Sequence, residues 1–246
     1  MRKKANTKNK NNVIYIDGIK APQLNLSLKK IQPLTENQLT AFDAYSEKRN
    51  LLLHGLAGTG KTFISLYLGL SSILKRNSEY SKVTIVRSVV PTRDIGFLPG
   101  DQNDKTKQYE LPYKAICSEL FGRDDAYEVL KHHRLIEFIT TSFIRGTTIN
   151  NSVVIVDECN NMTFHELDSI ITRVGTNCQI LFCGDYRQSD LSKQQEREGL
   201  KHFMTILHKM GCFEHVEFDE EDILRSDLVK RYIIMKDKLG YDSKII

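Results

Sequence analysis

Short apolar runs, separated by longer segments of mixed polarity, dominate the pattern along this chain. Six runs have the length and β-branched character of buried strands; they occupy 51–54, 83–87, 136–140, 153–156, 179–183 and 213–218. Apolar residues at amphipathic-helix spacing lie between them, in 61–75, 164–173 and 196–210, and a further helix is expected within 33–45. This alternation predicts a three-layer α/β fold, in which a mostly parallel sheet binds ligands at the carboxyl ends of its strands.

Length and composition favour one domain with extensions. The 246 residues suffice for one full-sized core. We expect residues 1–30 to form a basic, flexible tail and residues 31–246 to form a single domain. The apolar runs are too short to cross a bilayer, no signal-peptide pattern follows the basic start, and the five cysteines include no CxxC pair, so we expect a cytoplasmic protein without a membrane anchor. The net charge of +4 permits a polyanionic partner without requiring one.

A glycine-rich loop follows the first predicted strand and fits the pattern G-x-x-x-x-G-K-[ST]. Its residues are Gly55, Leu56, Ala57, Gly58, Thr59, Gly60, Lys61 and Thr62. Glycines let backbone N–H groups converge at a helix N-terminus, which suits a nucleotide phosphate. Lys61 would reach the outer phosphate oxygens, and the Thr62 hydroxyl would bind Mg²⁺. A plain glycine turn that caps a helix is the alternative, but it leaves Lys61 and Thr62 unexplained.

Two adjacent acids, Asp157 and Glu158, follow the run VVIV. At the carboxyl end of a parallel strand they would face the phosphate loop. Asp157 is predicted to hold Mg²⁺ and Glu158 to act as the general base toward an attacking water. The alternative is that they are ordinary loop acids or cap the helix near Phe164.

Two glutamines are further candidates. Gln188 lies in QILFCGDYRQSD, after another predicted strand, with Asp185 expected in the same cleft. Its amide could hydrogen-bond a γ-phosphate oxygen and the attacking water, or it could be an ordinary surface glutamine. Gln38, within PLTENQLTAFDAY, could read the edge of adenine and so favour ATP. A solvated glutamine on a helix face explains Gln38 equally well.

The segments GLAGTGKT, VIVDE and GDYRQSD, in this order, resemble the PhoH-like ATPases, which are relatives of the RecA-like core of superfamily 1 helicases. GFLPGD, FIRGTTINNSVVIVDE, TRVG and DILRSDLV extend the resemblance from about Leu34 to about Val229. It implies cytoplasmic ATP hydrolysis by a RecA-like P-loop domain, rings such as hexamers in some members, and a link to RNA or DNA metabolism. Small phage-encoded members are common.

The resemblance implies functional roles for the residues that match family motifs. Lys61 and Thr62 match the Walker A positions, Asp157 and Glu158 match the Walker B pair, and Gln188 matches the glutamine of motif III. Two departures stand out. The acidic pair is followed by Cys159, Asn160 and Asn161 in place of Ala-Gln-Asn, which shortens or removes a contact of the usual glutamine. Val86, Arg87 and Ser88 stand where Thr-Arg-Pro is usual.

Related helicases close the ATP site with an arginine of a second RecA-like domain, for which this chain is too short. A neighbouring subunit in a homo-oligomeric ring is the simplest donor. The candidates are Arg173, Arg187 and Arg225, with Arg173 or Arg225 favoured. Arg225 could instead pair with the acidic stretch FDEED, and Arg173 could simply favour the dipole of a helix end.

Related motors contact the backbone of a single strand just after the second strand of the sheet, so the resemblance implies that contact with single-stranded RNA or DNA would fall on Arg87, Thr92 and Arg93. The alternative is that these residues belong to a solvated loop. Aromatic residues of the next segment, Tyr109, Tyr113 and Phe121, could stack on bases or pack in the core. The sequence favours a helicase-related, oligomeric ATPase motor acting on single-stranded nucleic acid. A nucleotide-gated clamp with slow ATPase activity is the main alternative, and a small-molecule phosphotransferase is disfavoured by the adjacent acids and Gln188.

Overall fold

The computed structural model describes residues 15–16, 19–20, 26–88, 102–185 and 194–240. Within them, six strands form one sheet in which every neighbouring pair is parallel. They are β3 (Asn50–Gly55), β4 (Lys82–Arg87), β5 (Ile136–Thr140), β6 (Ser152–Asp157), β7 (Cys178–Gly184) and β8 (Phe213–Phe218). All six predicted strands are confirmed, with limits that shift by no more than one residue.

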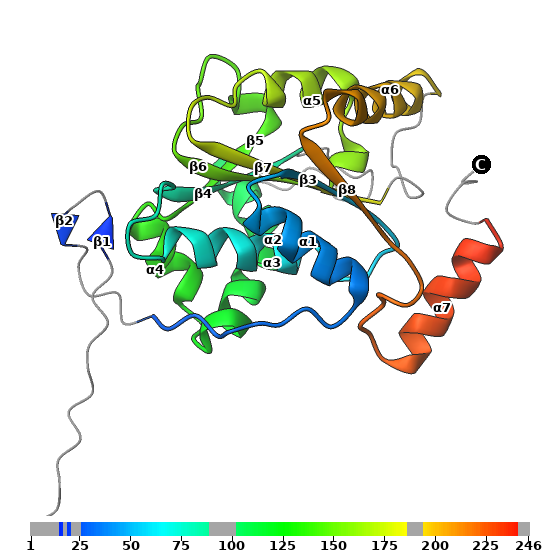
Figure 1. Ribbon diagram of the computed structural model, residues 1–246, viewed down its shortest axis with the longest axis horizontal. Helices are drawn as coiled ribbons and strands as arrows, with labels where there is room; N and C mark the ends of the chain where they lie inside the picture. Colours follow the sequence, from blue (N-terminus) through cyan, green and yellow to red (C-terminus); the bar gives the residue numbers. More distant parts are fainter. Residues whose placement is uncertain (1–14, 17–18, 21–25, 89–101, 186–193, 241–246) are drawn as a thin grey trace, which may run out of the picture.

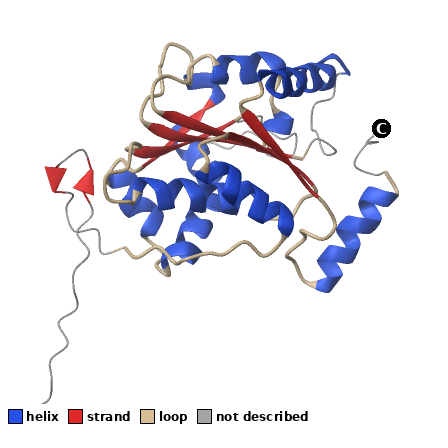
Figure 2. Ribbon diagram, viewed as in Figure 1, coloured by secondary structure: helices blue, strands red, loops and turns tan. Residues whose placement is uncertain are grey.

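Helices cover both faces of this sheet. The helices are α1 (Glu36–Ser46), α2 (Lys61–Ile73), α3 (Gln102–Phe121), α4 (Ala126–His132), α5 (Phe164–Ile171), α6 (Gln194–Met210) and α7 (Asp227–Lys238). Figure 1 shows α1 to α4 on one face and α5 and α6 on the other, with α7 beyond the end of the sheet. Figure 2 shows the resulting helix–sheet–helix layers. The predicted three-layer α/β architecture is confirmed.

Each face of the sheet carries its own hydrophobic core. In β3, Leu51 and Leu53 belong to the core beneath α1 to α4, whereas Leu52 belongs to the core beneath α5 and α6. This alternation is the period of two expected of a strand buried on both faces. The sheet is thereby fixed from both sides, and so are the ends of its strands.

The strand order is β5-β4-β6-β7-β3-β8. The strand that leads into the glycine loop, β3, is thus separated by β7 from β6, which ends at Asp157. Because all strands are parallel, the glycine loop, the end of β7 and the acidic pair meet at one edge. This is the arrangement of a RecA-like P-loop domain.

The segment that leads into residue 31 is part of the packed structure. Leu26, Leu28 and Ile31 pack against the core beneath α1 to α4, and the Lys29 backbone N–H donates to the Leu120 carbonyl oxygen at 2.9 Å. Ahead of it, β1 (Tyr15–Ile16) and β2 (Ile19–Lys20) pair antiparallel. Packing therefore begins ahead of the domain boundary expected at residue 31. Across the part of the chain described, no helix has the length and apolarity needed to cross a membrane.

Candidate nucleotide site

The glycine loop has a backbone conformation that requires glycine at three positions. Gly55, Gly58 and Gly60 have φ values of +116°, +76° and +85°, in the region that residues with a Cβ rarely adopt. The Thr59 hydroxyl donates to the Leu56 carbonyl oxygen at 2.9 Å and closes the turn. Gly60 is the N-cap of α2 and provides no side-chain cap. The loop therefore leads directly into the N-terminus of α2, where unpaired backbone N–H groups can bind phosphate.

Lys61 folds back over this loop. Its Nζ donates to the carbonyl oxygens of Gly55 at 2.9 Å and Leu56 at 2.6 Å, and to the Thr59 hydroxyl at 3.2 Å. Burial lowers the pKa of the Lys61 ammonium, and the negative charge of Asp185 opposes this effect. An ammonium held in a largely desolvated loop fits an anionic ligand, whose negative charge would further stabilise the protonated form.

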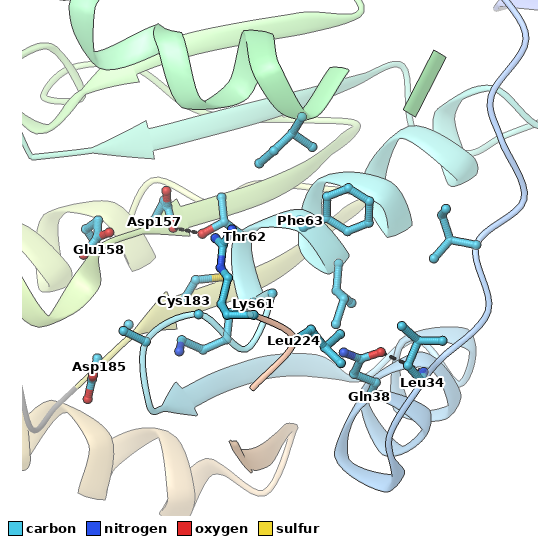
Figure 3. Close-up of a pocket in the computed structure, with 18 of the residues that line it drawn as sticks. Leu34, Gln38, Lys61, Thr62, Phe63, Asp157, Glu158, Cys183, Asp185 and Leu224 are labelled. Carbon is cyan, nitrogen blue, oxygen red and sulfur yellow. Dashed lines mark hydrogen bonds between the residues drawn. The ribbon is translucent and has the colours of Figure 1, made fainter. Parts of the chain in front are cut away.

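Thr62 and Asp157, the two residues predicted to bind Mg²⁺, are in direct contact. The Thr62 hydroxyl donates to Asp157 Oδ1 at 2.7 Å, a contact visible in Figure 3. Tyr113 of α3 donates its hydroxyl to the other oxygen, Oδ2, at 2.7 Å. Hydroxyl and carboxylate oxygens are the ligand types that suit Mg²⁺. The donor set therefore fits a magnesium ion beside the glycine loop.

Glu158 has an unusual backbone conformation. Its φ of +53° and ψ of +40° lie in the left-handed region, which is uncommon for a residue with a side chain. Such strained positions concentrate at functional sites. Figure 3 shows the Glu158 carboxylate beside the same cavity as Lys61 and Asp157, but directed away from Thr62. The two acids thus face different parts of the site.

A cavity of about 710 Å³ joins these groups, a volume in the range of small-molecule sites. The glycine loop and the ends of β6 and β7 form one wall, and the N-terminus of α1 and the segment before α7 form another. Gln38 is buried in this second wall, and its Oε1 accepts from the Leu34 N–H at 2.8 Å. The alternative of a solvated glutamine at position 38 is therefore wrong.

Asp222 ties the two parts of this second wall together. Its carboxylate is 1% exposed and accepts from the hydroxyl of Thr35, from Asn37 Nδ2 at 2.8 Å and from the Asp219 N–H at 2.9 Å. The sequence offered an ion pair between this acidic stretch and Arg225 only as an alternative. The partners of Asp222 at the start of α1 depend on the fold, and no local pattern indicates them.

Arg225 lies at the glycine loop of its own chain. A Cβ added to Gly58 would be 3.2 Å from Arg225 Cγ, and the Leu224 N–H donates to the Gly58 carbonyl oxygen at 3.3 Å. Arg225 also lines the cavity. Within a single chain this guanidinium therefore already borders the candidate phosphate site, whereas we expected it to act on a neighbouring subunit.

Arg173 lies at the opposite edge of the sheet. It follows α5, and its carbonyl oxygen accepts from the Ile149 N–H at 2.8 Å, ahead of the first residue of β7. The seven residues of β7 separate this edge from the cavity by about 20 Å. Arg173 Nε is buried and has no hydrogen-bond partner among the described residues. Arg173 is therefore too far away to act in its own cavity.

Gln188 and Arg187 lie outside the described residues, as do Thr92 and Arg93. The end of β7 is described up to Asp185, which lines the cavity as expected. Its backbone N–H donates to Asn160 Oδ1 at 3.0 Å. The short side chain at position 160 thus joins the ends of β6 and β7. A Cβ at Gly184 would lie 2.8 Å from Asn160 Oδ1, so glycine is needed for this close approach.

The second departure from the family pattern also has a structural role. The Ser88 hydroxyl donates to Glu166 Oε1 at 2.9 Å, and the Thr141 hydroxyl donates to the same oxygen at 2.8 Å. Burial raises the pKa of Glu166, but these bonds and those from Thr163 at the start of α5 outweigh it, so the pKa is lowered overall. Ser88 thereby links the end of β4 to β5 and α5.

The aromatic residues considered for base stacking are mostly in the core. Tyr113 and Phe121 are buried, so stacking on bases is wrong for both. Arg87 is half-buried at the end of β4, with its Cζ 5.8 Å from the centre of the Tyr109 ring. Burial and the charge of Asp157 hold the pKa of Tyr113 well above its ordinary value, so this tyrosine is a neutral hydrogen-bond donor. Its contact with Asp157 was not anticipated from the sequence.

A protein-family model described as PhoH-like protein matches residues 30–236. The PhoH-like protein of Bacillus subtilis (strain 168) is 31% identical over 194 residues, which are 78% of this chain and 60% of that protein. Protein PhoH of Escherichia coli (strain K12) is 28% identical over 224 residues, which are 89% of this chain and 62% of that protein. The chain thus spans about three fifths of these curated relatives.

Solved structures similar to this chain include a helicase and a large terminase. The crystal structure of Pif1 helicase from Candida albicans is 17% identical, covers 85% of this chain and 44% of its own, and has a TM-score of 0.43. The large terminase from a thermophilic bacteriophage is 13% identical, covers 82% of this chain and 50% of its own, and has a TM-score of 0.48.

Proposed function

Because the chain belongs to the PhoH-like protein family, we propose that its cavity binds ATP with Mg²⁺ and hydrolyses the γ-phosphate. The observation that carries this proposal is the convergence of the Thr62–Asp157 pair with Lys61 and Glu158 at one cavity beside a glycine loop. Nucleotide binding follows from the P-loop domain itself. Hydrolysis follows from the second acid, which a site that only holds a nucleotide does not need.

Each residue would contribute a separate interaction. The loop amides and Lys61 would hold the β- and γ-phosphates, while Thr62 and Asp157 would hold Mg²⁺. When bound, Mg²⁺ neutralises charge on the phosphate oxygens. Glu158 would orient the attacking water and accept its proton. Arg225, which lies beside Gly58 of the glycine loop, would add positive charge near the phosphates. An arginine from a second copy of the chain would not be needed for this.

Gln38 is proposed to select adenine. Gln38→Ala is expected to weaken ATP binding about fivefold, because one lost neutral hydrogen bond costs about 1 kcal/mol, and to reduce the preference for ATP over GTP. Half-saturating ATP and GTP concentrations measure the effect. Gln32→Ala is the matched control, since Gln32 is a second amide that lines the cavity. An unchanged ATP preference in Gln38→Ala would remove Gln38 from base recognition.

Coupling to single-stranded RNA or DNA, as a motor, is the second part of the proposal. It is supported by the family and by Arg87, a half-buried cation at the edge of the sheet where the site lies. The test measures ATP turnover with and without single-stranded RNA and DNA at several salt concentrations. We expect stimulation that falls with rising salt. Nucleotide-dependent nucleic-acid binding without any stimulation would instead favour the clamp, and no response to either nucleic acid would contradict both.

A ring in which Arg173 acts on the neighbouring subunit is also proposed, supported by the distance of Arg173 from its own cavity. Lys61→Ala and Arg173→Ala are each expected to be inactive alone. Mixed at equal amounts and allowed to assemble, they should recover about a quarter of wild-type turnover, because that share of sites combines an intact Lys61 with an intact neighbouring Arg173. No recovery in mixtures shown by mass to contain both variants would contradict the role of Arg173.

A further inference from the structure

The carboxylate of Asp157 is held from two sides by hydroxyl groups. Thr62 occupies Oδ1 from the start of α2, and Tyr113 occupies Oδ2 from α3, both at 2.7 Å. Tyr113 is 1% exposed, and its ring packs against Phe138 with centroids 5.8 Å apart. A buried ring with fixed neighbours holds its hydroxyl in one place. The orientation of Asp157 is therefore set by α3 as well as by the glycine loop.

Arg87 places a positive charge near the Tyr113 hydroxyl. This charge acts to lower the pKa of that hydroxyl, against burial and the charge of Asp157, and so strengthens it as a hydrogen-bond donor. An ionised carboxylate can only accept, so the Tyr113 hydrogen points to Asp157. Arg87 and Asp157 are partners in the register of β4 and β6, so the three groups lie together at neighbouring strand ends.

Tyr109 supports the same arrangement from one helical turn earlier. Its ring lies 5.8 Å from Arg87 Cζ, within the range of a cation–π contact. Residues four positions apart lie on the same face of a helix, so α3 presents a ring and a hydroxyl together to Arg87. Arg87 thus has the Tyr109 ring beside it and acts on Tyr113 through its charge.

We propose that Tyr113 is a positioning residue for the metal site: its hydroxyl holds Asp157 Oδ2, so that Oδ1 faces Thr62 and would face Mg²⁺. This inference rests on the proposed function, because it assumes that Asp157 serves a metal–nucleotide complex. Groups that orient metal-binding carboxylates in this way commonly change metal affinity by 10-fold to 100-fold when removed. Without the hydroxyl, the carboxylate would keep only its contact with Thr62 and would be free to rotate.

Tyr113→Phe tests the proposal, with Tyr127→Phe as the matched control. Both tyrosines are buried and donate to a carboxylate, but Tyr127 does so to Glu110 at 2.6 Å, away from the cavity. The readout is the rise in melting temperature that a non-hydrolysable ATP analogue produces as Mg²⁺ is added. We expect Tyr113→Phe to raise the half-maximal Mg²⁺ concentration about tenfold or more, and Tyr127→Phe to change it less than about twofold. Stabilisation by the analogue in EDTA should be the same in both variants.

Arg87→Gln supplies a second, independent variant, since it keeps Tyr113 but removes the positive charge that strengthens its hydroxyl as a donor. It should shift the Mg²⁺ requirement in the same direction and by less. A wild-type Mg²⁺ requirement in Tyr113→Phe, or an equal shift in Tyr127→Phe, would overturn the positioning role while leaving the proposed function intact. A wild-type protein that shows no Mg²⁺-dependent stabilisation by the analogue would overturn both.

Discussion

Glu158→Gln is expected to abolish most ATP turnover while leaving ATP binding near the wild-type level. The amide keeps the size of the side chain but cannot accept a proton from the attacking water, and a general base contributes roughly 10²- to 10⁴-fold to rate. The loop, Lys61 and the Thr62–Asp157 pair are untouched, so the nucleotide should still bind. Steady-state turnover and the melting-temperature shift with Mg²⁺ and ATP measure the two properties separately.

Two further variants show whether the loss of turnover in Glu158→Gln comes from the general base rather than from nucleotide binding or a change of charge. Lys61→Ala should lose both turnover and stabilisation by ATP, because it removes the cation that holds the phosphates. Glu119→Gln makes the same substitution at another acid that lines the cavity, and it should retain turnover. Wild-type turnover in Glu158→Gln would rule out its role as general base. Loss of ATP binding in that variant would assign the carboxylate to binding instead.

Gly55→Ala is expected to impair folding and Gly60→Ala to impair nucleotide binding, although both glycines belong to one motif. A Cβ at Gly55 would lie 2.0 Å from the Phe218 carbonyl oxygen, so β8 would have to separate from β3. Neither a rotamer change nor a small shift relieves a clash with backbone. We expect a loss of more than about 3 kcal/mol in the free energy of unfolding, or no folded protein.

Gly60→Ala should leave the fold in place. A Cβ there meets no atom within 4 Å, so the cost is the strain of a positive φ, about 1–2 kcal/mol. The added methyl group would instead intrude at the start of α2, where a phosphate would approach the backbone. Thermal melts with and without Mg²⁺ and ATP separate the two variants. A Gly60→Ala protein that binds ATP normally would contradict the phosphate assignment at that end of the loop.

The strands and the core of the site could be predicted because each rests on local chemistry. A parallel strand buried on both faces is a short apolar run, and the central strands β3, β4, β6 and β7 stand out in this way, whereas the edge strands β5 and β8 also carry charged residues. The glycine loop and the acids after β6 follow such runs directly, so a parallel sheet brings them together without further information. Asp157 and Thr62 needed only the correct strand order to meet.

The remaining features depend on packing that no local pattern encodes. The first half of α3, QNDKTKQYE, lacks a regular apolar stripe, and α7 buries none of its residues, so neither helix was predicted. Tyr113 was considered for base stacking because its contact with Asp157 arises only when α3 crosses the end of β6. The position of Arg225 beside Gly58 likewise requires the segment after β8 to return to the glycine loop.

The contacts of Lys61 have a consequence for how a ligand would enter. Lys61 donates to the Gly55 and Leu56 carbonyl oxygens, which occupy the place that phosphate oxygens would take and keep the turn closed. Asn160 joins the ends of β6 and β7. The glycine loop and the neighbouring strand ends are thus already in place. When a phosphate binds, the Lys61 ammonium would move from these carbonyl oxygens to the phosphate oxygens. Ordering costs on binding are small for such a receptor, so its capture of nucleotide should approach the rate set by diffusion rather than by loop folding.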